Sequence, residues 1–241
     1  MARSRHRSGS TASLFAEASK PPRTNLRTAQ AYSLIRHRIL SGDMPPDSQH
    51  LEGDLAAVLG MSRTPIREAL IRLAQERFVE IRPRRGIRVL PLSVGDIQDI
   101  FDIIIDLEAT AAMRAAERGL LTKQLRALDD FAKRASQAHR KLAIVPWARA
   151  DAGFHRKLVE FAGNDRLSTI LDVSLEQIHR ARMSTSHLQA HPRLYDHNHG
   201  LVAAAIRDRE PVRAHALQRD QRTRSAEALI ALLLSAGLDA V

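Results

Sequence analysis

Cysteine is absent from the chain, and aromatic residues are scarce. The 241 residues include no Cys, one Trp and two Tyr, and aromatic residues make up 4% of the composition. The lack of Cys excludes disulfides, iron–sulfur clusters and a thiol nucleophile, so any metal ligand must be a His, a carboxylate or an amide. The scarcity of aromatic rings argues against a stacking platform for single-stranded nucleic acid.

Long apolar runs are also missing from the sequence. The longest, residues 228–236, covers only about half of the ~20 residues that cross a bilayer. We therefore expect a soluble, cytoplasmic protein with no membrane partner. Good helix formers such as Ala, Leu, Arg and Glu dominate what remains, which predicts a mainly α fold.

Positive charge lies mostly in the first 92 residues. The formal net charge is +10, of which residues 1–25 contribute +4, residues 26–92 another +4 and residues 93–241 only +2. Such a surplus of Lys and Arg favours a polyanionic partner such as nucleic acid. The length allows two modest domains. We expect a flexible basic arm over 1–25, a DNA-binding domain over 26–92 and an all-helical domain over 93–241.

Three helical patterns and a hairpin fill the DNA-binding segment. Helices are expected over 29–40 and 51–59, the second ended by Gly60, and a third begins after Ser62. Ser62 or Thr64 offers a hydroxyl to cap the third helix. Two β-like runs, 78–81 and 87–89, are joined by a basic turn and predict a hairpin. This order describes a winged helix-turn-helix.

The third helix carries a face suited to reading DNA. In a winged helix-turn-helix this helix enters the major groove, where Arg can donate paired hydrogen bonds to guanine. Arg63 and Arg67 are four residues apart and share a face that is offset from the apolar stripe. The hairpin tip can lie in the minor groove or along phosphates. We expect DNA contacts from Ser62, Arg63, Thr64, Arg67, Arg84, Arg85 and Gly86.

Residues 51–73 resemble the winged helix-turn-helix of GntR-type transcription regulators, above all in the core Ser-Arg-Thr-Pro-Ile-Arg-Glu-Ala-Leu at 62–70. The resemblance implies a sequence-specific regulator, more often a repressor, that binds a short inverted repeat of double-stranded DNA as a homodimer. Two departures stand out. Arg77-Phe78 replaces the usual Gly before the first wing strand. Gly53 replaces a DNA-contacting Arg of some members, which predicts fewer contacts from the second helix.

From residue 93 onward the pattern is helical throughout. Ser93 and Asp96 predict a capping box at the start. We expect an antiparallel bundle of about six helices, whose core suits a small-molecule or metal site. The expected helices cover 93–118, 122–139, 146–161, 165–183, 192–207 and 211–235. The fold class is thus mainly α, with one small β-hairpin.

Three polar residues are expected to meet inside this bundle. Asp151 and His155 are four residues apart on one helix face, and His199 shares its face with apolar neighbours, so all three should point inward. A carboxylate and imidazoles so placed can bind a divalent ion such as Zn, Ni or Mn. The alternative is a set of core polar groups hydrogen-bonded to one another around water.

The bundle also resembles the FCD domain of the FadR-like subgroup, in Leu107-Glu108, residues 151–155 and residues 199–206. The resemblance implies a fourth metal ligand at Gln221, where Gln is poorer than the usual His. It further implies a small carboxylate effector, such as an organic acid, bound beside the metal and an Arg.

Ile104 stands where the subgroup has that Arg, which argues for a less acidic effector, for another cation, or for no effector at all. Arg180 and Arg182 are alternatives, although we expect both to be solvated surface residues. Two other functions remain open. One is a metal-dependent enzyme at the bundle site, for which no general base is evident; the other is an architectural DNA-binding protein with an inert bundle. We expect no enzyme, and a protein that joins the nucleoid when bound.

Overall fold

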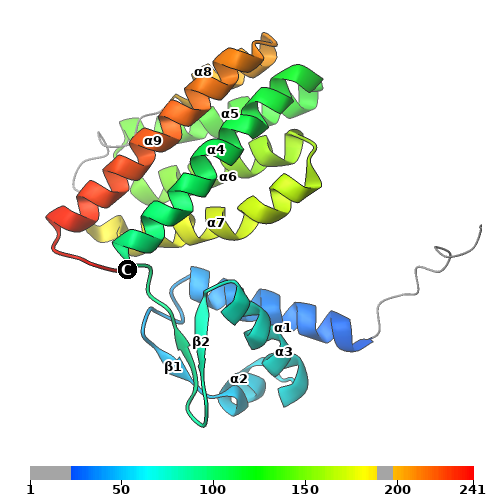
Figure 1. Cartoon of the computed structure of the whole chain (residues 1–241), viewed down its shortest axis with the longest axis vertical. Coiled ribbons are helices and arrows are strands. Elements are labelled where there is room, and N and C mark those ends of the chain that lie inside the picture. Colours follow the sequence, from blue (N-terminus) through cyan, green and yellow to red (C-terminus); the bar gives the residue numbers. More distant parts are fainter. Residues whose placement is uncertain (1–22, 189–197) are drawn as a thin grey trace, which may run out of the picture.

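The computed structural model describes residues 23–188 and 198–241, with side chains from residue 26 onward, and within these ranges it contains nine α-helices and three short strands (Figure 1). Each of the two parts of the chain has its own hydrophobic cluster, one among residues 31–89 and one among residues 92–233. The mainly α fold with a small wing is confirmed.

The first part is a three-helix unit with a small sheet. The helices are α1 (Arg23–Leu40), α2 (Glu52–Leu59) and α3 (Arg63–Gln75), and the strands are β1 (Gln49–His50), β2 (Val79–Arg82) and β3 (Gly86–Val89). The sheet is antiparallel in the order β1-β3-β2. Sequence patterns missed β1, because two residues are too few to show an alternation. It lies so close to Gly86 that a β-carbon there would overlap the carbonyl oxygen of His50.

The turn between α2 and α3 follows local rules with one exception. Gly60 adopts the left-handed conformation at φ 61° and ψ 36°, as predicted for a helix C-cap. Ser62 occupies the N-cap of α3 in an extended conformation, but its side chain accepts no hydrogen bond from the helix. The expectation of a hydroxyl cap at Ser62 was therefore wrong. The residue is exposed, so water can satisfy the first amides.

Arg77 carries the conformation that a glycine normally provides. Its φ is +59°, in the left-handed region, and it lies two residues after the end of α3. The next residue, Phe78, is fully buried in the core beneath α3. The turn therefore keeps the shape that it would have with a glycine at this position. Because Arg77 has a side chain, this backbone conformation costs roughly 1 kcal/mol of stability.

Arg77→Gly should therefore stabilise the protein by about 1 kcal/mol, because glycine adopts this conformation without a steric penalty. Urea unfolding monitored by circular dichroism measures the change. Arg84→Gly at the wing tip, where φ is +65°, is the matched comparison. A lower unfolding free energy for the Arg77 variant would mean that the arginine side chain contributes more than the strain costs.

The second part is a six-helix bundle. Its helices are α4 (Val94–Arg118), α5 (Thr122–Arg140), α6 (Ile144–Phe161), α7 (Asp165–Ser184), α8 (His199–Arg207) and α9 (Pro211–Ser235), with a short 3₁₀ helix at Ser186–Leu188. Helix α4 packs along α9, and α6 lies between α5 and α7. The expected helix over 192–207 is seen from His199; residues 189–197 lie outside the described part.

The start of the bundle is fixed by local and distant contacts. The predicted capping box is present, since the Asp96 amide donates to the Ser93 hydroxyl at 3.0 Å. The C-terminal tail returns to this point, where the Val94 amide donates to the Asp239 carbonyl at 3.0 Å (Figure 1). Across the ranges that the structure covers, no helix has the length and hydropathy needed to cross a membrane.

Candidate functional site

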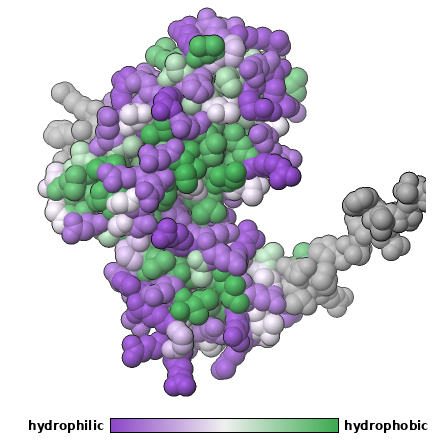
Figure 2. Space-filling model, viewed as in Figure 1, coloured by the Kyte–Doolittle hydropathy of each residue, from purple (hydrophilic) through white to green (hydrophobic). Residues whose placement is uncertain are grey.

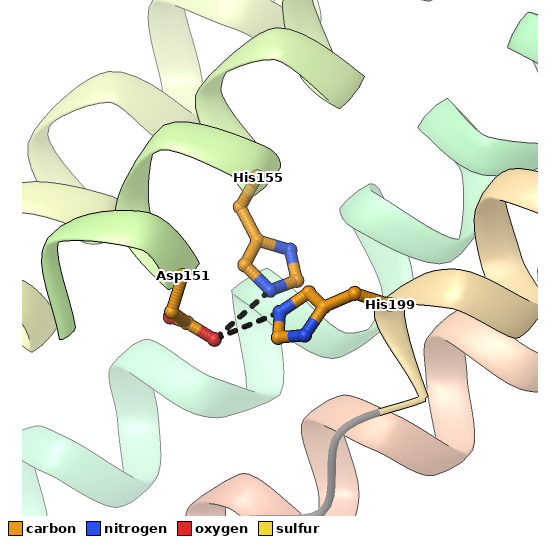
Figure 3. Close-up of side chains that lie close together, drawn as sticks. All are labelled: Asp151, His155 and His199. Carbon is orange, nitrogen blue, oxygen red and sulfur yellow. Dashed lines mark hydrogen bonds and ion pairs between the residues drawn. The ribbon is translucent and has the colours of Figure 1, made fainter. Parts of the chain in front are cut away.

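Three residues from two helices meet in the centre of the bundle. Asp151 and His155 project from α6, and His199 projects from the start of α8 (Figure 3). Their side chains are buried, with exposed fractions of 3%, 0% and 1%. The Asp151 Oδ1 atom lies 3.1 Å from Nε2 of His199 and 3.4 Å from Nε2 of His155. The inward orientation predicted for all three is confirmed.

This geometry fits a divalent ion. Two ligand atoms that each lie about 2.0 Å from a tetrahedral ion are about 3.3 Å apart, close to the spacings seen here. The three ligand atoms all lie within 4.8 Å of one another. Nδ1 of His155 lies 2.9 Å from Oε2 of Glu108, a contact that orients the ring and leaves Nε2 facing Asp151.

Some buried polar atoms of the bundle make no hydrogen bond to any residue that the structure describes. Among the described residues, Nε2 of His155 and both amide atoms of Gln221 are buried and make no hydrogen bond. Gln221 projects from α9 and is 2% exposed. Buried polar atoms are rarely left without a partner, so these atoms support the presence of a further ligand. Nε2 of His155 thus fits an ion beside Asp151 and His199. Gln221 lies three residues after Gln218 and four before Ser225, on the face of α9 from which these two residues contact His155 and Arg182.

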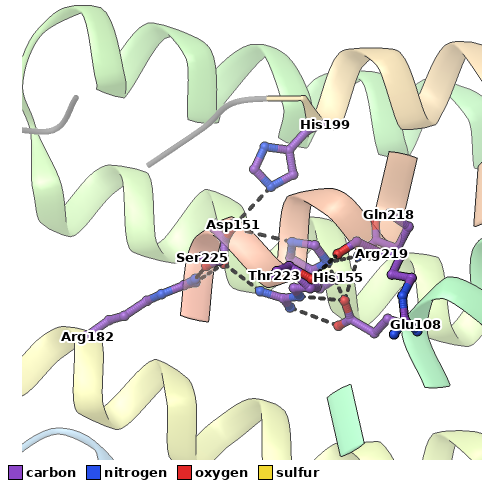
Figure 4. A network of polar contacts seen from close by, with 10 residues as sticks. Glu108, Asp151, His155, Arg182, His199, Gln218, Arg219, Thr223 and Ser225 are labelled. Atoms are coloured by element: carbon purple, nitrogen blue, oxygen red, sulfur yellow. Dashed lines mark hydrogen bonds and ion pairs between the residues drawn. The ribbon is translucent and has the colours of Figure 1, made fainter. Parts of the chain in front are cut away.

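A second carboxylate, that of Glu108, contacts His155 on the side away from Asp151. The sequence did not predict this contact. Glu108 on α4 accepts two hydrogen bonds from Arg222, at 2.6 and 2.8 Å, and one from Gln218 at 2.7 Å (Figure 4). Glu108 and Arg222 are 114 residues apart in sequence. The position of Glu108 in the middle of a helix is the one local signal that it is buried. That signal does not indicate which residue is its partner.

Arg182 on α7 completes the cluster from the other side. It donates hydrogen bonds to Oδ2 of Asp151 and to the hydroxyl of Ser225 (Figure 4). Arg222 also lies near Asp151, with Nη1 at 3.8 Å from Oδ2. Asp151 therefore faces imidazoles with one oxygen and guanidinium groups with the other.

The expectation that Arg180 and Arg182 are solvated surface residues was wrong. Their exposed fractions are 3% and 2%. Arg182 lies in the cluster, whereas Arg180 faces away from it and donates to the Leu90 carbonyl at 2.8 Å. Ile104 is fully buried in the apolar core of the bundle. Of the two proposed replacements for the missing cation, the structure brings only Arg182 to the cluster.

The charges of the cluster balance without an ion. Burial alone would raise the pKa of Asp151, but Arg182 and His155 outweigh it and hold the pKa well below its usual value. Burial would likewise raise the pKa of Glu108, but Arg222 and then His155 lower it to about 2. Burial lowers the pKa of His199, against the opposing effect of Asp151. Two carboxylates thus face two guanidinium groups.

Arg222→Met should lower the unfolding free energy by about 3 kcal/mol or more, because it leaves the buried Glu108 carboxylate without its charged partner. Adding Glu108→Gln to this variant should restore most of the loss. Arg213→Met on the same helix breaks an exposed pair with Glu210 and should cost no more than about 0.5 kcal/mol. Chemical denaturation of the native protein and the three variants measures these changes; equal effects of Arg222→Met and Arg213→Met would contradict the assignment.

The predicted DNA-contacting residues lie at the opposite end of the molecule from the bundle. At the start of α3, Ser62, Arg63, Thr64 and Arg67 are exposed, whereas Ile66 on the same helix is buried. The guanidinium group of Arg63 lies over Gly53, since a β-carbon there would be 3.5 Å from Nη2. Arg84 and Arg85 are exposed at the tip between β2 and β3, and Gly86 is half-buried (Figure 1).

A winged helix-turn-helix joined to a helical bundle with a buried polar cluster is typical of a regulator with a DNA-binding domain and a separate sensing domain. The comparisons give the family. The family model for "Bacterial regulatory proteins, gntR family" matches residues 27–89, and the model for the "FCD domain" matches residues 99–221. The chain belongs to the GntR family of transcriptional regulators and carries an FCD domain. Members of these families and the chain's relatives are regulators, not enzymes.

Relatives and solved structures agree with this assignment. The chain is 37% identical over 138 residues to an HTH-type transcriptional regulator in the TAR-I ttuE-ttuC' intergenic region of Agrobacterium vitis, covering 56% of this chain and 81% of that protein. It is 27% identical to the HTH-type regulator YdhC of Bacillus subtilis, covering 78% and 85% of the two chains. McbR/YncC of E. coli has the same fold, with a TM-score of 0.71 at 20% identity over 84% of this chain and 96% of that one.

Proposed function

We propose that the chain is a homodimeric repressor that binds a short inverted repeat through residues 26–92 and responds to a small carboxylate, together with a divalent ion, in residues 93–241. It acts on operators in the bacterial cytoplasm, where it joins the nucleoid. The observation that carries the DNA-binding part is the exposed pair Arg63 and Arg67 at the start of a helix whose other face is buried.

The contacts with DNA follow from this placement. Arg63 and Arg67 read base edges in the major groove, while Ser62 and Thr64 bond to phosphates or bases. The wing residues Arg84 and Arg85 lie along the adjacent minor groove, and the compact Gly86 allows close approach. One such unit contacts few base pairs, so two units related by a twofold axis are needed for a specific site.

An apolar surface on the bundle supports the dimer. Ile103 on α4 and Ile170 on α7 have exposed fractions of 43% and 57%. Figure 2 shows apolar side chains gathered on the bundle face that α4, α7 and α9 form. Contiguous apolar patches of this kind are typical of protein–protein interfaces. We place the twofold contact on this face.

The effector site lies at the buried cluster. Asp151, His155, His199 and the amide oxygen of Gln221 hold the ion, which supplies positive charge for the carboxylate of the effector. Arg182 serves as the second cation that Ile104 does not provide. Arg180 is left out of the effector site, since it faces the DNA-binding domain. The effector changes DNA affinity only if it binds the two dimer geometries unequally, and the linker 89–94 transmits the difference.

Arg67→Ala should weaken specific operator binding at least tenfold, about 1.4 kcal/mol, because a base-reading Arg contributes on the order of 1–3 kcal/mol. The operator is obtained by selection from a random DNA pool, and affinities are measured by fluorescence anisotropy at fixed salt. Arg38→Ala, a change of the same residue type in the last turn of α1, is the control and should bind almost as well as the native protein.

Equal operator affinity of the Arg67 variant and the native protein would defeat the reading of α3. Recovery of no inverted repeat from the pool, with binding that depends on salt alone, would favour an architectural DNA-binding protein instead.

Gln221→His should tighten Zn²⁺ binding at least tenfold, because imidazole is a better zinc ligand than a neutral amide oxygen. Competition with a chromogenic chelator measures the affinity, and elemental analysis should find about one ion per chain in the loaded protein. His199→Gln removes an imidazole from the same site and should abolish stoichiometric binding. If neither the native protein nor the Gln221 variant takes up Zn²⁺, Ni²⁺ or Mn²⁺, the metal site is refuted.

A further inference from the structure

Helix α7 lies between the buried cluster and the DNA-binding domain. Arg180 and Arg182 are two residues apart, which at 100° per residue places them on nearly opposite faces of the helix. Arg182 donates to Asp151 in the cluster. Arg180 donates to the Leu90 carbonyl at 2.8 Å, on the chain that leads from the wing to the bundle. One rigid element therefore contacts both functional parts of the molecule.

The outer face of α7 contacts the DNA-binding domain at two more points. Glu176 forms an ion pair with Arg36 of α1, with 2.6 Å between Oε2 and Nε. Gln177 donates to the Glu76 carbonyl at 2.8 Å, directly after the recognition helix α3. These contacts touch α1, the end of α3 and the wing linker. A shift of α7 thus changes the position of the recognition helix relative to the bundle.

The contact made by Arg180 is incompletely satisfied. Its side chain is 3% exposed, yet Nε and Nη1 have no hydrogen-bond partner among the described residues. The guanidinium lies 5.9 Å from the ring centre of Phe78, and burial lowers its pKa to about 10. A buried cation with few partners is costly, so an arrangement in which it gains partners competes with this one. A contact of this kind is suited to a switch.

Space for such a movement exists on both sides of the contact. A cavity of about 120 Å³ is lined by Arg180, Met183 and residues of the DNA-binding domain such as Met44. A second cavity, of about 480 Å³, is lined by Gln177 on α7 and by Glu76 at the end of α3. Open space therefore lies beside the contacts of α7 with the DNA-binding domain, although Val173 of α7 packs against the core of that domain.

We propose that Arg182 is a positioning residue that couples the occupancy of the cluster to the DNA-binding domain through α7. The inference rests on the proposed function, because a cation bound at Oδ1 of Asp151 would draw negative charge from the carboxylate whose Oδ2 contacts Arg182. The hold of Asp151 on Arg182 then weakens, and α7 changes its contacts at Glu76 and Leu90. The two faces of α7 therefore act together, and the cluster and the operator each favour one of two positions of the helix.

Asp151→Asn tests this coupling without any ion, because the amide keeps the size of the side chain but removes the charge that holds Arg182. Hydrogen–deuterium exchange of the full-length protein under native conditions should change at least threefold in residues 76–92. Arg182→Lys, which keeps the charge but cannot contact Asp151 and Ser225 together, should act in the same direction. Asp129→Asn, which breaks an exposed pair with Arg207, is the matched control and should leave this segment unchanged.

A double-mutant cycle separates coupling from simple destabilisation. Arg180→Met removes the contact on the opposite face of α7. In that background Asp151→Asn should have little effect on residues 76–92, with non-additivity of at least about threefold. Additive effects, or exchange that rises equally over the whole chain, would overturn the inference. Zn²⁺ alone should reproduce the change in the native protein. If Asp151→Asn changes the exchange of residues 76–92 but Zn²⁺ does not bind, the coupling through α7 stands and the metal site is refuted.

Discussion

The buried carboxylate of Asp151 organises the bundle. Its two oxygens face different groups: Oδ1 lies beside the imidazoles of His155 and His199, and Oδ2 accepts from Arg182 on α7. Because all these side chains are nearly inaccessible to solvent, removing any one charge leaves another uncompensated in a region of low dielectric. The positions of α6, α7 and α8 are therefore linked through one side chain, and a change at that point is felt in all three helices.

The cluster combines both interpretations that the sequence allowed. Its charged groups are partnered, as core polar groups must be, and Glu108 with Arg222 would be stable there without an ion. The nitrogen of His155 that faces Asp151 and the amide of Gln221 make no hydrogen bond within the described residues. A fully satisfied network would leave no such atoms. The charged groups of the cluster thus balance one another around candidate ligand atoms. A cation added there would leave an uncompensated positive charge, which favours the binding of an anion as well.

Local features of the fold were predictable, and distant partners were not. Gly60, the Ser93 capping box and the inward faces of Asp151 and His199 follow from spacing along one helix or turn, and all are confirmed. The hydroxyl cap at Ser62 and the solvated state of Arg180 and Arg182 were wrong. An arginine is buried only where a remote acceptor exists, and the acceptors of these two, Leu90 and Asp151, come from other elements. The same reason hid the pairing of Arg222 with Glu108.

The central claim is that occupancy of the buried cluster governs DNA binding. Operator affinity of chelator-treated protein, measured during titration with Zn²⁺ in a buffer that does not bind metal, tests it most directly. The account predicts a change of at least tenfold, a coupling of about 1.4 kcal/mol, that is complete at about one ion per chain. An operator affinity that stays the same across the titration, while the protein takes up the ion, would contradict it.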